Sequence, residues 1–244
     1  IARFLLDNLL RVSYMTATSI AQELNISDVT VIRFARSLGY SGYSDLQKDL
    51  QRKMSDNLET SSTLLANPSS VLRMNMEVSA DSSTIMDLAC NNEIKNLNRF
   101  ISRNNDATFV EASYIIMNSH RKIVFGVRGS SSMAFSFTMR LRYMVDDVFP
   151  ILYADPNDSY PLYSITKDDC LVIFGFVNLP QATIDAVELA KKRGAKIIAF
   201  TDMEASFLAK SANVAVICSV AGISFSSYTT PLLATEIISA NIAH

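Results

Sequence analysis

The chain contains no tryptophan, only two histidines and only three cysteines among its 244 residues. The cysteines, Cys90, Cys170 and Cys218, are far apart and lack the paired spacing of a zinc or redox motif. An odd number also leaves one thiol over in any disulfide pattern, so we expect free thiols in a reducing cytoplasm. The two histidines are His120 and His244. A catalytic triad or a zinc site is therefore poorly supported, and we expect no cofactor and no metal.

Long apolar runs and a strong charge of one sign are also missing. No run approaches the roughly 20 residues of a membrane span, and no signal-peptide layout is present, so we expect no membrane partner. The net charge is -2 and the pI about 5.7, which argues against a protein coated in nucleic acid. Residues 1–53 nevertheless carry seven Lys and Arg against five Asp and Glu. Specific DNA binding needs only a positive contacting face.

The composition is that of a globular protein, since 49% of the residues are hydrophobic and the length suffices for one or two domains. The first residue is isoleucine, and residues 1–8 already have helical spacing, so we expect the natural N-terminus to lie upstream. Residues 55–70 are rich in Ser and Thr and include Asn-Pro at 67 and 68, which indicates a connection between domains.

A helix-turn-helix pattern spans residues 16–39, TATSIAQELNISDVTVIRFARSLG. Ala21 is small enough for two helices to cross there, and Asn25 can adopt the left-handed conformation of a sharp turn. The other anchors of a small core follow Ala21 by five, ten and thirteen positions: Ile26, Val31 and Phe34. This spacing predicts two short helices joined by a tight turn.

The second of these helices, 28–38, has defined ends because Ser27 is a good N-cap and Gly39 a good C-terminal stop. Such a recognition helix inserts its N-terminal half into the major groove. Arg33 can reach a guanine edge, while Arg36 and Ser19 suit phosphates. The predicted DNA-binding residues are Ser19, Ser27, Asp28, Thr30, Arg33 and Arg36. A three-helix protein-binding module with the same core spacing is the alternative.

The run from Met15 through VTVIRFARSLGYSGYSDLQKDL closely resembles the N-terminal domain of the RpiR-type bacterial transcriptional regulators, including the Gly-Tyr-Ser-Gly-Tyr-Ser segment at 39–44. The resemblance implies a helix-turn-helix domain followed by a sugar-isomerase-type (SIS) domain that senses a phosphosugar. The domains expected are a helix-turn-helix domain at 1–56, a linker at 57–81 and a SIS domain at 82–244. Operator DNA, a phosphosugar effector and a second copy of the chain are the partners expected.

The second half of the chain alternates short apolar runs with helical patterns. The expected strands are 122–127, 148–153, 170–176, 196–201 and 214–220. Because each strand is apolar throughout, the pattern predicts a parallel sheet covered on both faces, a five-stranded flavodoxin-like α/β domain. In such a sheet ligands bind at the carboxyl ends of the strands.

The loop at 126–132, GVRGSSS, combines glycine, hydroxyl groups and free helix amides, which together can hold a phosphate. It is similar to the first sugar-phosphate loop of SIS domains, whose serine falls on Ser130. The predicted ligand-binding residues of this loop are Arg128, Ser130, Ser131 and Ser132. An ordinary capped loop is the alternative, since any serine can cap a helix.

The loop after the third strand departs from the family. SIS domains usually carry Ser-x-Ser-Gly-x-Thr there, and the frame is fixed by the following match, ATIDAVELAKKRGAKIIAFTD. The corresponding residues are 175–180, GFVNLP, in which Asn178 is the only polar side chain. Either the ligand is held differently, with Asn178 and Arg128 contributing, or the site has changed its specificity or decayed.

Three functions remain open. The first is a ligand-responsive, dimeric transcription factor, and the second keeps the DNA function but uses the α/β domain only for dimerisation. The third is a sugar-phosphate isomerase, for which Glu236 is the available acid although no motif places it at the site. The segment 229–243 is apolar on most sides, so we expect it to pack on the sheet and also against a second subunit.

Overall fold

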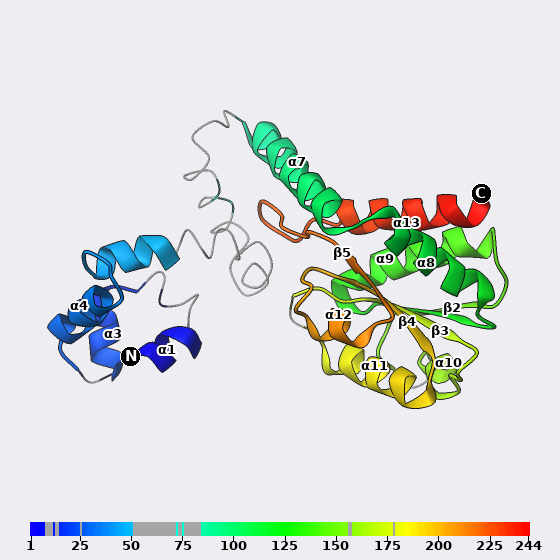
Figure 1. Cartoon of the computed structure of the whole chain (residues 1–244), viewed down its shortest axis with the longest axis horizontal. Helices are drawn as coiled ribbons and strands as arrows, with labels where there is room; N and C mark the ends of the chain where they lie inside the picture. The colour runs from blue at the N-terminus through cyan, green and yellow to red at the C-terminus, as the bar shows by residue number, and fades with distance from the viewer. Residues whose placement is uncertain are drawn as a thin grey trace. The chain divides into compact units, whose positions relative to one another are not determined.

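The computed structural model describes residues 1–7, 12, 15–24, 26–50, 72, 75, 84–155, 158–177 and 179–244 (Figure 1). The chain divides into two compact units, 1–65 and 66–244. The expected linker, 57–81, lies outside the described residues except for positions 72 and 75. No helix in the described part of the chain is long and apolar enough to cross a membrane.

The N-terminal unit is helical. It contains α1 (Ala2–Asp7), α3 (Ala17–Leu24), α4 (Asp28–Ser37) and a helical segment at 43–50. Its core is formed by Leu5, Val12, Ile20, Ala21, Val31, Ala35, Tyr43 and Leu46. Ala21 and Val31 are buried as expected. Phe34 is only half-buried, and the neighbouring Ala35 is fully buried instead. Asn25, the expected turn residue, lies outside the described residues.

The ends of α4 are those that the sequence predicts. The Ser27 side chain accepts a hydrogen bond from the Thr30 N–H at 3.2 Å, which caps the N-terminus. Gly39 follows the C-terminus with a φ of +93°, a left-handed conformation that glycine adopts without strain. Position, length and capping of this helix therefore follow from local chemistry.

The C-terminal unit is built on a five-stranded parallel sheet with the order β2-β1-β3-β4-β5. The strands are β1 (Lys122–Phe125), β2 (Val148–Ile151), β3 (Cys170–Phe174), β4 (Lys196–Thr201) and β5 (Val214–Ile217). This order confirms the flavodoxin-like prediction and places the switch point between β1 and β3. Four of the five strands end two or three residues earlier than predicted.

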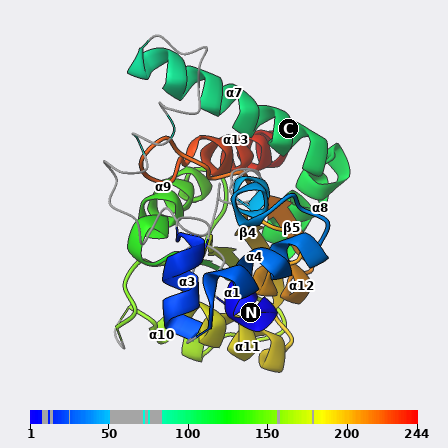
Figure 2. The same ribbon diagram turned by 90° about the vertical axis from the view of Figure 1, so that its left-hand side faces the viewer.

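Helices cover both faces of the sheet (Figures 1 and 2). One face carries α8 (Asp106–Asn118), α9 (Ser131–Arg142) and α13 (Thr229–Ala243), and the other carries α10 (Tyr160–Tyr163), α11 (Gln181–Arg193) and α12 (Phe207–Ser211). Alternate strand residues enter the two cores, as the uninterrupted apolar runs predict. The remaining helix, α7 (Ile85–Arg103), projects beyond these layers, its C-terminal end beside the start of α13 (Figure 1).

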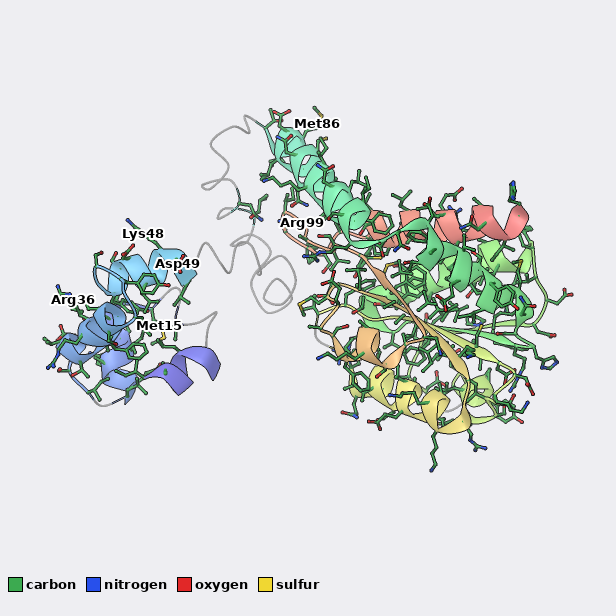
Figure 3. All side chains as sticks on the ribbon, in the orientation of Figure 1. Met15, Arg36, Lys48, Asp49, Met86 and Arg99 are labelled. Atoms are coloured by element: carbon green, nitrogen blue, oxygen red, sulfur yellow. The ribbon has the colours of Figure 1, made fainter. Side chains whose placement is uncertain are left out.

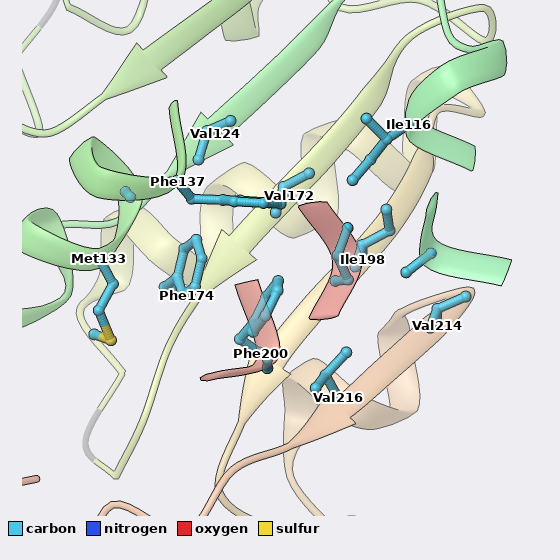
Figure 4. Close-up of a cluster of buried hydrophobic side chains, with 14 of the residues drawn as sticks. Ile116, Val124, Met133, Phe137, Val172, Phe174, Ile198, Phe200, Val214 and Val216 are labelled. Carbon is cyan, nitrogen blue, oxygen red and sulfur yellow. The ribbon is translucent and has the colours of Figure 1, made fainter. Parts of the chain in front are cut away.

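Aromatic rings fix the core beneath the switch point. Phe174 of β3 stacks on Phe200 of β4 with centroids 4.3 Å apart, and Phe137 of α9 meets both rings edge-on at 6.2 and 6.0 Å (Figure 4). Such pairs add to the stabilisation from burial alone. They tie α9, whose N-terminus follows the first loop, to β3, which leads into the second loop.

The opposite, amino-terminal edge is held by a buried ion pair. Asp169 is 0% exposed and accepts hydrogen bonds from Arg121 Nη2 at 2.7 Å, Arg121 Nε at 3.1 Å and the Thr166 N–H at 2.7 Å. Burial by itself would raise the pKa of Asp169, but these hydrogen bonds and the Arg121 charge outweigh it and lower the pKa to about 2. The turn before β3 is thereby joined to the residue before β1.

Candidate functional site

The first candidate surface is the outward face of α4. Arg33 and Arg36 are exposed, while Val31 and Ala35 on the opposite side are fully buried. The Arg36 side chain lies on the outside of the N-terminal unit (Figure 3), and its Nε donates to the Ser41 carbonyl at 3.2 Å. The two guanidinium groups are thus presented to solvent by a helix that is anchored from behind.

The first turn of α4 is occupied by capping interactions. The hydroxyls of Ser27 and Thr30 lie 2.8 Å apart in a hydrogen bond, and Asp28 Oδ1 accepts the Val29 N–H at 2.8 Å. All three predicted side chains are exposed. Their observed contacts shape the helix N-terminus and leave the side chains open to solvent.

The N-terminus of α3 forms a second exposed cap. Thr16 Oγ1 accepts the Ser19 N–H at 3.1 Å, and the two hydroxyls lie 2.8 Å apart. Beside them, Gln47 Nε2 donates to the Met15 carbonyl at 3.0 Å. Thr16 was not among the predicted residues, although a threonine directly before a helical pattern is a recognisable cap. Free amides at such an end suit a phosphate.

A buried tyrosine fixes this cap in place. The Tyr43 hydroxyl donates to the carbonyls of Val12 at 2.8 Å and Met15 at 3.1 Å. Burial raises the pKa of Tyr43 to about 12, so the hydroxyl remains a donor at neutral pH. The helix that carries Tyr43 begins at residue 43.

The second candidate site lies at the switch point, in the loop after β1. The turn Arg128–Ser130 is a 3₁₀ helix that leads directly into α9. Gly126 is required here because a Cβ would lie 2.6 Å from the Ser130 carbonyl oxygen and 2.9 Å from the Ala134 Cβ. The loop therefore folds tightly over the end of its strand.

The three predicted serines differ in what their hydroxyls do. Ser131 Oγ donates to the Arg128 carbonyl at 2.7 Å, and Ser132 Oγ donates to the Gly129 carbonyl at 3.1 Å. The side chain of Ser130 makes no capping hydrogen bond and is half-buried. Ser130 is consequently the serine of this loop whose hydroxyl is best placed to meet a ligand.

Both loops at the switch point hold a non-glycine residue at positive φ. Arg128 has a φ of 56° and Val177 a φ of 57°. Such conformations are costly, above all for a β-branched side chain, and they concentrate at ligand sites. Asn178, the predicted polar residue of the second loop, lies outside the described residues.

Asp202, at the carboxyl end of β4, was not predicted as a site residue. It is 4% exposed, and within the described residues its Oδ2 has no hydrogen-bond partner. Burial raises its pKa, against the opposing effect of hydrogen bonds from its own N–H and that of Val177. Asp202 thus lies against the second loop at Val177. Its position directly after an apolar strand was the available signal.

Tyr228 is a further residue that sequence reasoning missed. Its hydroxyl lies against Gly129, where a side chain would collide with it. The residue directly precedes α13, is half-buried, and has a pKa raised by burial. Its contact with a loop almost 100 residues away along the chain is tertiary, so no local pattern could have revealed it.

The remaining candidates are Glu236 and a hollow at the amino-terminal edge of the sheet. Glu236 forms an ion pair with Arg140 between α13 and α9, and more than half of its side chain is exposed. A hollow of about 420 Å³ opens at the amino-terminal edge of the sheet, where His120, Lys167 and Lys196 lie, away from the switch point. Among the described residues, no group of three or more His, Cys, Asp or Glu side chains could hold a metal ion.

Comparison with known proteins identifies both units. Residues 1–57 match the helix-turn-helix domain of the rpiR family, and residues 115–239, about half of the chain, match the SIS domain. A helix-turn-helix-type transcriptional regulator of Providencia stuartii is 28% identical over 206 residues, covering 82% of this chain and 67% of its own length. One from Clostridium perfringens is 24% identical over 200 residues, covering 81% and 66%. The chain spans about two thirds of the length of the curated relatives it matches.

Solved structures share the fold. The sugar isomerase domain of an RpiR transcription factor from Sphaerobacter thermophilus matches with a TM-score of 0.62 and 19% identity, covering 65% of this chain and 89% of that one. Vibrio vulnificus NanR, solved with ManNAc-6P, matches with a TM-score of 0.60 and 19% identity, covering 99% and 83%. With an rpiR-family helix-turn-helix domain followed by a SIS domain, the chain belongs to the RpiR-type family of regulators.

Proposed function

We propose that the chain is a DNA-binding transcriptional regulator of sugar-metabolism genes, which binds operator DNA through residues 28–38 and senses a phosphosugar in its SIS domain. The observation that carries the proposal is α4 itself, a capped helix anchored through Val31 and Ala35 that exposes Arg33 and Arg36. The curated relatives are named as transcriptional regulators, which supports the same function.

In the DNA complex, Arg33 contacts a guanine edge, because a guanidinium group matches the O6 and N7 acceptors of guanine. Arg36 and Ser19 contact phosphates on either side, the latter with the free amides of the α3 N-terminus. Ser27, Asp28 and Thr30 shape the helix end and meet the backbone or base edges nearby. Residues 1–53 carry an excess of only two positive charges, which predicts a modest non-specific affinity for DNA.

In the effector site, the phosphate binds at the first loop, where Ser130 offers a hydroxyl and Arg128 a positive charge. Ser131 and Ser132 contribute through the N-terminus of α9, since their hydroxyls bond to loop carbonyls. Asn178 is the polar group of the second loop. The ligand of NanR, ManNAc-6P, makes amino-sugar phosphates the first compounds to test.

The active form in this proposal is a cytoplasmic homodimer or a higher homo-oligomer. Two recognition helices then enter successive major grooves about 34 Å apart on an imperfect palindrome. Effector binding shifts DNA affinity through a coupling of about 1 to 3 kcal/mol between the two sites. Light scattering of the chain, measured alone and bound to DNA, tests this oligomeric state.

The proposal treats the chain as a regulator and not an enzyme. Glu236, the acid considered for isomerase chemistry, pairs with Arg140 on a helix surface. An assay for aldose-ketose interconversion of sugar phosphates tests the alternative, and turnover would contradict the proposal.

Two measurements distinguish a ligand-responsive regulator from a DNA-binding protein whose α/β domain serves only for dimerisation. Selection from random duplexes, followed by fluorescence anisotropy, tests specific DNA binding. Thermal-shift and calorimetric titration with a panel of sugar phosphates that includes ManNAc-6P tests the sensor. We expect a selected site with a two-fold repeat and a thermal shift with at least one phosphosugar. Specific DNA binding with no shift for any of them would leave the α/β domain as a dimerisation module.

A further inference from the structure

An exposed valine lies in the first turn of α4. The side chain of Val29 is 57% exposed, whereas apolar groups stabilise a fold by leaving water. The core of the N-terminal unit is closed on the other side of the helix, by Val31 and Ala35. Within the described residues, the core of this unit therefore does not account for an apolar side chain at position 29.

The position of Val29 links it to the predicted DNA-binding face. In an α-helix, residues four and seven apart share one side, so Val29, Arg33 and Arg36 form a single outward stripe. Both arginines of that stripe are exposed. Val29 stands one turn closer to the helix N-terminus than Arg33, in the half of a recognition helix that enters the major groove.

The polar neighbours of Val29 are already engaged. Ser27 and Thr30 share a hydrogen bond of 2.8 Å, and Asp28 accepts the Val29 N–H. Valine is also stiff about χ1, so its methyl groups point in a fixed direction. The first turn of α4 thus presents a rigid apolar contact between polar groups that hold the helix end.

We propose, resting on the DNA-binding function above, that Val29 reads the 5-methyl group of a thymine beside the base contacted by Arg33. Among the four bases, the thymine methyl is the apolar feature of the major groove. Val29 and Arg33 are about 6 Å apart along the helix axis. Base pairs rise by about 3.4 Å, so the thymine lies one or two steps from the pair that Arg33 reads.

The experiment uses the full chain and a duplex selected from random sequences. Each thymine near the Arg33-dependent base pair is replaced in turn by deoxyuridine, which lacks only the methyl group. At one position we expect wild-type binding to weaken about fourfold, the effect of removing one buried methyl. Val29→Ala should bind the thymine and deoxyuridine duplexes equally. Val110→Ala, which removes the same two methyl groups from an equally exposed position on α8, outside the recognition helix, should keep the wild-type discrimination.

Three outcomes decide the matter. A fourfold loss with wild type and Val110→Ala, absent in Val29→Ala, supports the inference. Equal wild-type affinity for thymine and deoxyuridine at every position contradicts it while leaving specific DNA binding intact, and this comparison needs no variant to fold. Failure of the wild-type chain to select any duplex would overturn the DNA-binding function and the inference with it.

Discussion

Replacing Asp169 by asparagine removes the charge that joins the turn before β3 to Arg121. The carboxylate is 0% exposed and accepts hydrogen bonds from Arg121 and Thr166 at 2.7 to 3.1 Å. Breaking a buried pair on one side leaves the other charge uncompensated and costs about 3 kcal/mol or more. We expect Asp169→Asn to lower the free energy of unfolding by roughly that amount at pH 7, measured by urea denaturation.

The Asp169–Arg121 pair also predicts how the stability of the fold depends on pH. The pKa of Asp169 falls from its usual 3.8 to about 2 in the folded chain, so the folded state binds the proton less tightly than the unfolded state. Its stabilisation is fully present above about pH 4 and is lost as the pH falls toward 2. Between pH 5 and pH 3 the gap in stability between wild type and Asp169→Asn should narrow by about 1 kcal/mol.

Asp168→Asn is the matched control, one residue away. Asp168 is exposed and pairs with exposed Lys167, and a surface pair of this kind contributes little to stability because water screens it. We expect this variant to unfold like wild type at each pH. Equal losses for Asp168→Asn and Asp169→Asn, or a gap that does not narrow in acid, would refute the reasoning from burial and hydrogen bonding.

Further predictions concern the two sites. Gly126→Ala should lower the free energy of unfolding by about 1 to 3 kcal/mol and weaken phosphosugar binding, because its Cβ meets the Ser130 carbonyl; thermal unfolding and calorimetry measure both. Ser130→Ala should weaken phosphosugar binding about tenfold in calorimetry, and Ser132→Ala, whose hydroxyl is engaged at 3.1 Å, much less. Tyr43→Phe should destabilise the N-terminal unit by about 1 to 2 kcal/mol in thermal unfolding, because two backbone carbonyls lose their donor. Wild-type behaviour of Gly126→Ala, Ser130→Ala or Tyr43→Phe would contradict the corresponding prediction.

Much of the fold follows from local sequence. The apolar runs of β1, β3 and β4 required burial on both faces, and the structure shows two cores that share these strands. Ser27 and Gly39 fixed the ends of α4. Side-chain depth was less predictable, since Ala35, not Phe34, is the fully buried residue. Neighbouring residues of a helix point about 100° apart, so the rotation of α4 against its neighbours decides which is buried, and that orientation is tertiary.

The candidate effector site was only partly accessible to sequence reasoning. The glycine and serines of the first loop indicated its position, but the hydroxyls of Ser131 and Ser132 turn back to loop carbonyls. Asp202 and Tyr228 come from other parts of the chain and reach the loops through the tertiary fold. Sequence identifies which loops meet at a switch point, whereas the contacts within them depend on the packed structure.

The most direct test of the account is the affinity of the Arg33→Ala chain for the selected duplex, measured by fluorescence anisotropy beside wild type and Arg36→Ala. We expect Arg33→Ala to bind more weakly by about 1 to 3 kcal/mol and to lose its preference at one base pair. Arg36→Ala should instead weaken binding to all sequences alike and reduce the salt dependence by about one charge. If Arg33→Ala binds the selected duplex as tightly and as selectively as wild type, α4 is not the helix that reads DNA.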